Sequence, residues 1–175
     1  MDIKDLLQRR RSIRKYTNTP IEKEKVDQLI RSALLSPTSC NGRPWEFIVV
    51  EDQELLEKLS VAKVGAQSLK GATLGIVVCA DPQKSDVWVE DTSIASIMIQ
   101  MQAQDLGLGS CWIQIRERNY QDGISAGDYL KKLLGIPEHL QVGSIISLGY
   151  PAETRPEHTD DELLLEKIHR NTYKQ

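Results

Sequence analysis

The spacing of apolar residues alternates along the chain between helical and strand patterns. Helical spacing over Asp2 to Arg10 predicts a short helix with Asp2 as its N-cap. A second helix is predicted after Thr19, because Thr19 to Glu22 has capping-box spacing with a proline at the first helical position. Pro37 ends this helix, so two helices precede the first predicted strand.

Unbroken apolar runs rich in β-branched residues predict the strands. The run from Leu74 to Ala80 is continuous enough to be buried on both faces of a sheet. Short helices are predicted after Asp52 and around Tyr129, and the stretch from Tyr120 to Gly127 is predicted as a polar loop. The predicted strands are Trp45 to Val50, Leu74 to Ala80, Ser110 to Ile115 and Val142 to Leu148.

The longest predicted helix runs from about Val89 to Leu106. Apolar residues recur along it at helical spacing and extend around much of its circumference, so we expect a central, buried helix. Glycines follow this helix rather than a strand, which argues against the Gly-x-Gly-x-x-Gly turn of a dinucleotide-binding fold. The apolar residues that carry the pattern are Ile94, Ala95, Ile97, Met98, Ile99, Met101 and Ala103.

Composition restricts the class of protein. A length of 175 residues with 40% hydrophobic and 27% charged residues is ordinary for a globular protein, and we expect one domain over residues 1–175. No apolar run approaches the ~20 residues of a membrane span, and the charged N-terminus is unlike a signal peptide, so a cytoplasmic location is the default. The cysteines are widely separated, and no catalytic triad, paired-carboxylate or metal-ligand pattern is recognisable.

The stretch from Arg9 to Tyr16 is strongly basic. Up to Tyr16 the chain carries six Lys or Arg against two Asp, in a protein of net charge −3. Arginine side chains are planar forks suited to phosphates, and Ser12 adds a hydroxyl that can donate to the same anion. Three interpretations stay open from these residues alone: a basic helix end, a nucleic-acid patch, or a site for a small anion.

A second stretch, Ser36 to Trp45, distinguishes between these interpretations. A basic Arg-Arg-Ser-x-Arg motif followed about thirty residues on by Pro-(Ser/Thr)-Ser-x-Asn-x-x-Pro-Trp resembles the FMN-dependent nitroreductase family. The likeness continues in Leu106 to Ile113 and in Leu148 to Pro151, in family order. It implies an α+β fold with a central, mostly antiparallel sheet flanked by helices, a long buried central helix, and a homodimer with exchanged C-terminal tails.

The resemblance also implies an FMN cofactor held at the subunit interface. Arg10 and Ser12 would serve its phosphate and ribityl chain, and Arg14 would approach the N1 and C2-carbonyl edge of the ring. The second stretch would reach the flavin from the other subunit, although Asn41 could equally hold its own loop through an Asx turn. Backbone N–H groups of a late strand would face the N5 and O4 edge. The site residues implied are Arg10, Arg11, Ser12, Arg14, Pro37, Thr38, Ser39, Asn41, Trp112, Ile113 and Gln114.

The activity implied is that of an NAD(P)H-dependent oxidoreductase without a metal, without a catalytic side chain, and without nucleic-acid or membrane partners. Reduced nicotinamide would deliver electrons to the flavin, and a nitroaromatic, quinone or similar acceptor would then take them in a ping-pong cycle. The alternatives are a specialised member such as a reductive dehalogenase, a flavin-binding protein without turnover, or a nucleic-acid-binding module using Arg9 to Lys15.

Three positions depart from the family pattern, and one of them is Met98 of the long helix, where some relatives have a polar residue. Gln114 stands where relatives often have glycine, and the basic residue expected after the Gly-Tyr-Pro turn falls in Asp160 to Glu162. We therefore expect either a phosphate site with one arginine fewer or the use of Lys167 in its place.

Overall fold

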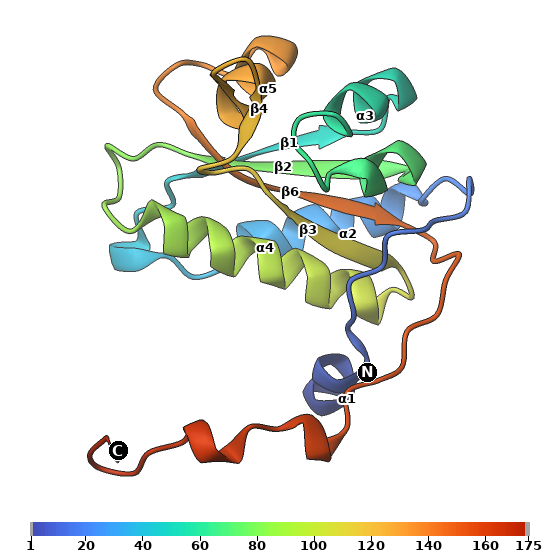
Figure 1. Cartoon of the computed structure of the whole chain (residues 1–175), viewed down its shortest axis with the longest axis vertical. Coiled ribbons are helices and arrows are strands. Elements are labelled where there is room, and N and C mark those ends of the chain that lie inside the picture. The colour runs from blue at the N-terminus through green and yellow to red at the C-terminus, as the bar shows by residue number, and fades with distance from the viewer. Residues whose placement is uncertain (1, 174–175) are drawn as a thin grey trace.

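The computed structural model describes residues 2–173, and its centre is a four-stranded antiparallel sheet (Figure 1). The strand order is β1–β2–β6–β3, with each neighbouring pair antiparallel. Every residue of β2 is buried, as its unbroken apolar run predicts. The strands are β1 (Trp45–Val50), β2 (Leu74–Ala80), β3 (Gly109–Gln114) and β6 (Gln141–Gly149), which confirms the four predictions to within one residue at each end.

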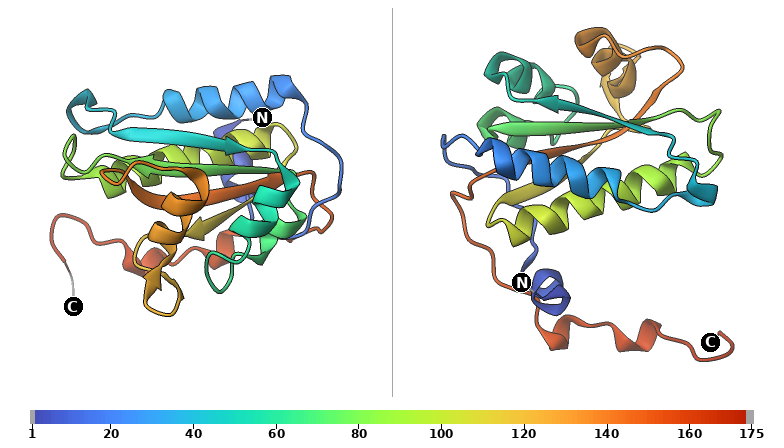
Figure 2. Two further views of the ribbon diagram at one scale, coloured as in Figure 1. Left: turned by 90° about the horizontal axis from the view of Figure 1, so that it is seen from above. Right: turned by 180° about the vertical axis from the view of Figure 1, so that it is seen from behind.

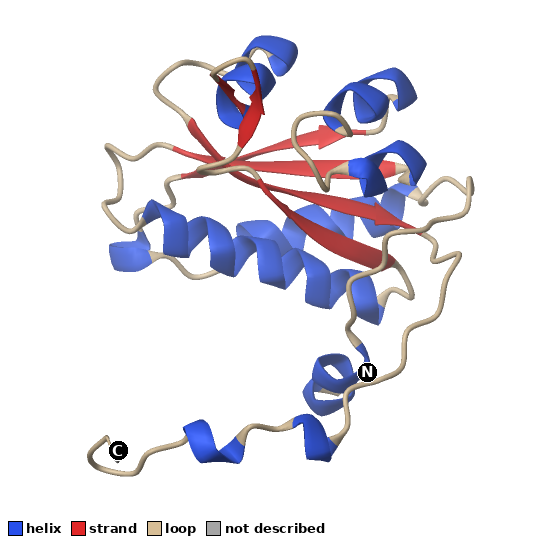
Figure 3. Ribbon diagram, in the orientation of Figure 1, coloured by secondary structure: helices blue, strands red, loops and turns tan. Residues whose placement is uncertain are grey.

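Helices cover the two faces of this sheet in separate layers (Figure 3). Successive residues of β2 alternate between two apolar clusters, with Ile76 in one and Val77 in the other. The Ile76 side is covered by α2 and α4, which lie against each other (Figure 2), and the Val77 side by α3, η2 and α5. These elements are α2 (Lys23–Leu34), α3 (Gln53–Leu59), the 3-10 helix η2 (Gln67–Gly71), α4 (Trp88–Asp105) and α5 (Ala126–Leu134).

Local capping explains most helix starts. Asp2 caps α1 (Ile3–Arg9) by accepting from the Asp5 N–H at 2.9 Å, and Asp52 caps α3 in the same way, which confirms both predictions. The predicted capping box at Thr19 is wrong, because α2 begins only at Lys23. Ile21 is buried in the core just before the helix, and the N-cap Glu22 is extended, with φ −61° and ψ 141°.

Only one side of α4 is buried in the single chain, whereas the sequence predicted a helix buried around much of its circumference. In the single chain its sheet side is buried, while Ile94, Ile97 and Met98 are 36%, 39% and 39% exposed. Polar side chains can be buried on the sheet side because they have hydrogen-bond partners there. For example, Ser96 Oγ lies 3.0 Å from Ser144 Oγ of β6. The buried residues are Asp91, Thr92, Ala95, Ser96, Ile99, Gln100 and Ala103.

The predicted polar loop from Tyr120 to Gly127 is partly wrong. It contains a small hairpin of β4 (Asn119–Gln121) and β5 (Ile124–Ser125), and α5 begins at Ala126. Asp122 and Gly123 have φ angles of 50° and 77°, so the turn is of the Asp-Gly type that favours hairpins. Ser125 then caps α5 by accepting from the Asp128 N–H at 3.0 Å.

The C-terminal tail passes beside α1, outside the main body of the sheet (Figure 1). The tail runs past α1, with the His158 N–H donating to the Gln8 carbonyl at 2.9 Å and Arg9 paired with Glu157 at 3.3 Å. Beyond these contacts come two short 3-10 helices, η3 (Asp160–Glu162) and η4 (Leu165–Lys167). Among the residues described, no helix is long and apolar enough to cross a membrane.

Candidate functional site

The basic stretch runs along the outer edge of β3. Ser12 forms a bridge with Ser110, and the Ile13 N–H donates to the Ser110 carbonyl at 2.9 Å. Ile13 packs so closely that a Cβ atom on Gly109 would lie 2.7 Å from its Cγ2 atom. The stretch is therefore held by backbone bonds and by a glycine that leaves room for Ile13.

Three members of the first motif act on the thiol of Cys111 in β3. Burial raises the pKa of this thiol above its ordinary value. The charge of Arg14, a hydrogen bond from Ser12 and the charge of Arg10 oppose this rise. Arg11 differs, because its Nη1 donates to the Pro156 carbonyl of the tail at 2.5 Å.

β3 is an edge strand, and its outer edge presents backbone N–H groups. Because the Ser110 carbonyl points outward to Ile13, the alternating ladder also turns Trp112 and Gln114 outward, while Ile113 pairs with Ile145 of β6. Among the described residues, the bridge at Ser110 is the only strand contact on this outer edge. The structure thus places two of the three predicted backbone donors on the open edge.

The Gln114 side chain does not occupy that edge. Its Oε1 accepts from the Trp112 indole N–H at 3.1 Å, and its Nε2 donates to the Arg116 carbonyl at 3.1 Å. Both side chains lie on the face toward α4, beside Val89 and Ser93. Gln114 stands where relatives often have glycine, and its larger side chain is held by the contact with Trp112.

A chain of buried hydroxyls links the basic stretch to η2. Tyr16 Oη donates to the Ile13 carbonyl at 2.6 Å and lies 2.9 Å from Ser147 Oγ, which in turn lies 3.1 Å from Ser68 Oγ. Burial raises the pKa of Tyr16 well above its usual range. Sequence reasoning missed this network, although Tyr16 closes the basic octapeptide.

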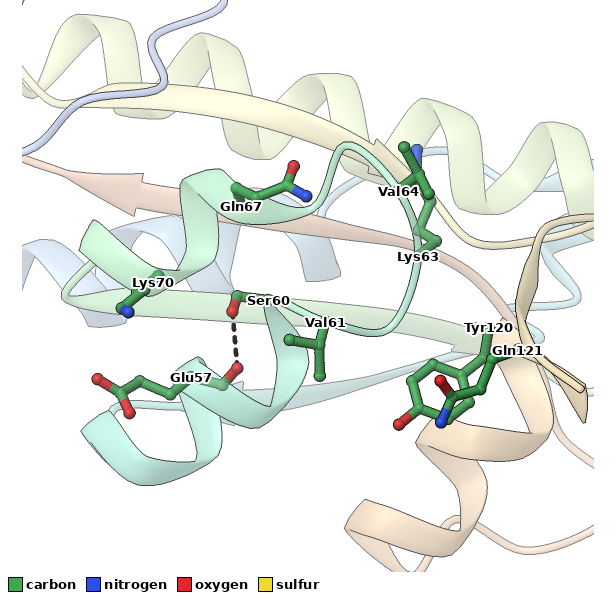
Figure 4. A pocket seen from close by; sticks show the side chains of 9 residues that line it. All are labelled: Glu57, Ser60, Val61, Lys63, Val64, Gln67, Lys70, Tyr120 and Gln121. Carbon is green, nitrogen blue, oxygen red and sulfur yellow. Dashed lines mark hydrogen bonds between the residues drawn. The ribbon is translucent and has the colours of Figure 1, made fainter.

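Beside η2 lies a cavity of about 690 Å³ that the sequence did not reveal (Figure 4). Gln67 and Lys70 of η2 line it, together with Ser60 and Val61 after α3 and with Tyr120 of the hairpin. Its size is within the range of small-molecule sites. No local pattern marks it, because its walls come from separate parts of the chain.

The second motif forms a loop anchored at the start of α4. The Ser39 N–H donates to Asp91 Oδ1 at 2.9 Å, and Ser85 Oγ donates to Asp91 Oδ2 at 2.8 Å. Asp91 is only 2% exposed, so both carboxylate oxygens are bonded inside the protein. No sequence pattern pointed to Asp91 as a partner of this loop.

The loop itself is unusual in its backbone. Cys40, Asn41 and Arg43 have φ angles of 49°, 54° and 44°, in the left-handed region that non-glycine residues rarely adopt. Asn41 Oδ1 accepts from Arg43 Nε at 2.9 Å, and Thr38 Oγ1 accepts from the Arg43 N–H at 3.1 Å. The Asn41 side chain therefore does stabilise its own loop, through Arg43.

The structure does not bring the first and second motifs together within one chain. Asp91 lies in the first turn of α4, whereas Ser110 follows its end. At about 1.5 Å per residue, the 18 residues of α4 span about 27 Å. One small ligand cannot contact both motifs of the same chain.

One basic residue of the tail lies near the first motif. Arg155 Nη2 lies 3.1 Å from Glu153 Oε2, and Glu153 Oε1 accepts from the Arg14 N–H at 2.7 Å. That N–H is the main reason why the pKa of Glu153 is lowered. Lys167 lies further along the tail in η4. Among the residues described, no group of three potential metal ligands is found.

The comparisons with known proteins agree with this fold. The model of the nitroreductase family matches residues 7–88 and 62–150. A solved FMN-dependent nitroreductase from Clostridium difficile R20291 is 47% identical with a TM-score of 0.96, covering 98% of this chain and 100% of that one.

Two relatives are similar along most of the chain. A "Putative NADH dehydrogenase/NAD(P)H nitroreductase" of Archaeoglobus fulgidus is 41% identical and covers 94% of each chain. An FMN reductase [NAD(P)H] of Bacillus subtilis is 27% identical, covering 82% of this chain and 63% of that protein. The fold and these matches define the protein as an α+β oxidoreductase. More narrowly, the chain belongs to the nitroreductase family.

Proposed function

We propose that this chain binds FMN between two subunits and transfers electrons from NAD(P)H to a small organic acceptor. The observation that carries the proposal is the backbone contact of Ser12 and Ile13 with Ser110, which sets the basic stretch with Arg10 and Arg14 against the open edge of β3. The residues present fit a flavin, because cations and a hydroxyl for a phosphate lie beside outward backbone N–H groups for a ring. The FMN-dependent neighbour supports the choice of cofactor.

Each part of the site has a distinct task. Arg10 and Ser12 hold the phosphate and ribityl chain, and Arg14 stabilises negative charge at the N1 and C2-carbonyl edge. The N–H groups of Trp112 and Gln114 are the donors for the N5 and O4 edge. When bound, FMN supplies the hydride chemistry, so the side chains bind, orient and tune rather than react. Arg155 is the tail residue best placed to assist at the phosphate end.

The proposed homodimer follows from the separation of the two motifs. Since about 27 Å of helix lies between them, the Pro37 to Asn41 loop completes a flavin site only when it comes from a second chain. The single chain also leaves an apolar surface of the kind that subunits bury. Its exposed members are Ile3, Leu7, Ile94, Ile97 and Met98, with Leu163, Leu164, Leu165 and Ile168 of the tail.

The nucleic-acid alternative is less compatible with these contacts. Arg9 is paired with Glu157, and Arg11 is bound to the Pro156 carbonyl. Arg9 and Arg11 are thus already bound by the tail, whereas a nucleic-acid patch would need these side chains available for phosphates. A colourless protein that binds DNA with steep salt dependence would support that alternative instead.

The first test is the identity and state of the cofactor. Purified protein should be yellow, release FMN on heating as identified by mass spectrometry, and lose its colour when NADH or NADPH is added without oxygen. Light scattering should give a dimer for the flavin-loaded protein. Release of FAD, or a flavin-loaded monomer, would contradict the proposal.

The second test separates the two arginines. Arg10→Ala should weaken FMN retention without changing the potential of bound flavin, whereas Arg14→Ala should lower that potential and slow reduction at saturating FMN. The loss of one charge-stabilising donor is worth about 3 kcal/mol by analogy with oxyanion sites. Arg14→Lys should recover much of it, and Arg31→Ala on the exposed side of α2 is the control. An unchanged potential in Arg14→Ala would place Arg14 elsewhere.

A further inference from the structure

The second-motif loop, residues 38–43, makes few hydrogen bonds with the rest of the chain. Its own side-chain bonds connect loop residues with one another. Within residues 2–173, the bond from the Ser39 N–H to Asp91 Oδ1, at 2.9 Å, is the only hydrogen bond from this loop to another segment. Because three residues of the loop are in the left-handed region, it needs an outside contact to keep this conformation.

The Asp91 carboxylate is held rigidly. It lies in the first turn of α4, where the positive end of the helix dipole favours a negative charge. Its second oxygen accepts from Ser85 Oγ at 2.8 Å, so two bonds fix the orientation of the carboxylate. Since this buried residue stands on a helix of 18 residues, the loop is anchored to a rigid element.

The first motif of the same chain is out of reach of this anchor. Asp91 lies in the first turn of α4, whereas Ser110 follows the end of the helix, which spans about 27 Å. In the proposed dimer, the loop that Asp91 holds completes the flavin site of the other subunit. A change at Asp91 therefore acts on a flavin that the partner's basic stretch binds.

We propose that Asp91 is a positioning residue that acts across the subunit interface: its carboxylate keeps Ser39 and Asn41 in the conformation that meets the flavin of the partner subunit. This inference rests on the proposed function. An anchored loop is already ordered when the cofactor binds, so less conformational entropy is lost and the affinity is higher. Asp91 itself does not touch the flavin, and its effect passes through the Ser39 N–H.

The first measurement is a titration of FMN into single variants, followed by flavin fluorescence at a temperature where each variant is folded. Asp91→Ala should weaken FMN binding by about tenfold, as expected for a lost hydrogen bond to a charged acceptor. Asp91→Asn should recover most of the affinity, because its amide oxygen can still accept from the Ser39 N–H. Glu90→Ala, at an exposed acid of the same turn, is the control and should bind like wild type. Wild-type affinity in Asp91→Ala, or no recovery in Asp91→Asn, would overturn the proposal.

The second measurement uses mixed dimers of two defective subunits. One subunit carries Arg10→Ala, which weakens its own basic stretch, and the other carries Asp91→Ala. Different affinity tags on the two subunits allow the mixed dimer to be purified. If Asp91 acts on the partner's flavin, both changes fall in one site and the other site is intact. The mixed dimer should then bind one FMN with wild-type affinity, although neither parent dimer has such a site.

A mixed dimer without a tight site would overturn the proposal. An effect of Asp91 within its own chain would leave one defect in each site, and a general disturbance of the Asp91→Ala subunit would weaken the basic stretch that it contributes. Arg10→Ala paired with Glu90→Ala is the control, and this dimer should keep one tight site. A wild type that binds no FMN would instead contradict the proposed function. A wild-type dimer that binds two FMN, beside a mixed dimer without a tight site, would contradict the role of Asp91 alone.

Discussion

The two ends of α4 hold the two halves of the proposed site in different ways. At its C-terminal end, the basic stretch is fixed by backbone bonds to Ser110 and Ala152 and by close packing against Gly109. At its N-terminal end, the second motif is a loop tied to α4 through the carboxylate of Asp91. One half is therefore held by backbone geometry and space, whereas the other is anchored to α4 through one buried carboxylate.

This difference teaches which kind of change each half tolerates. Backbone bonds survive most side-chain substitutions, so the basic end is sensitive mainly where a glycine is needed. The loop end contains three left-handed non-glycine residues, a conformation that costs of order 1 kcal/mol or more each and persists only when other contacts enforce it. The loop should lose this conformation when the carboxylate of Asp91 is removed.

The largest expected effect is at the loop end. Asp91→Ala should lower the free energy of unfolding by about 3 kcal/mol, because it leaves the part-buried Ser39 N–H and the buried Ser85 hydroxyl without their acceptor. FMN affinity should fall as well if the loop serves the partner's cofactor. Chemical denaturation and flavin titration measure the two effects. Glu90→Ala, an exposed acid in the same turn, is the control and should change little.

At the basic end, the corresponding change is Gly109→Ala. The added methyl group would lie 2.7 Å from Ile13, so the stretch must move and the unfolding free energy should fall by about 2 kcal/mol. Ile13→Ala in the same protein should restore part of the loss, because it removes the Cγ2 contact and leaves only the Cβ atom of residue 13, at 2.9 Å. Gly71→Ala is the control, because no atom lies within 4 Å of its added Cβ. A Gly109→Ala protein of unchanged stability would show that packing does not fix this end.

Alkaline pH should weaken the basic end selectively. The pKa of Tyr16 is raised by burial above its ordinary value of 10.0, so the folded state keeps its proton where the unfolded state has lost it. The contribution of the neutral Tyr16 side chain to the free energy of unfolding is fully present below pH 10. As the pH rises above 10, this contribution falls by up to about 1.4 kcal/mol per pH unit. Tyr16→Phe should show a shallower decline above pH 10 than wild type, whereas Tyr173→Phe, at an exposed position, should follow wild type.

The smallest effect is that of the same hydroxyl at neutral pH. Tyr16→Phe removes the bonds to the Ile13 carbonyl and Ser147, and should cost about 1 kcal/mol. The loss should be less than that of Asp91→Ala, since the backbone bonds of the basic stretch remain. Thermal unfolding of both variants at pH 7 makes the comparison. A larger loss for Tyr16→Phe would reverse our ranking of the two ends.

The local parts of the fold and of the site could be predicted from the sequence. The four strands, the caps at Asp2 and Asp52 and the motif around Ser12 depend on residues only a few positions apart. The Asp122-Gly123 turn was equally local, so the hairpin it forms was within reach of the same reasoning. The start of α2 was not, because the burial of Ile21 outweighs a favourable capping sequence.

Contacts across the chain were decided only by the tertiary structure. Asp91 meets Ser39 across 52 positions, and Tyr16 meets Ser147 across 131. The sequence determined that α4 is a long helix, apolar around most of its surface, but not which face the sheet covers. Serine, threonine and glutamine can be buried there because the fold supplies partners such as Ser144, and a polar residue is excluded from a core only when no partner reaches it.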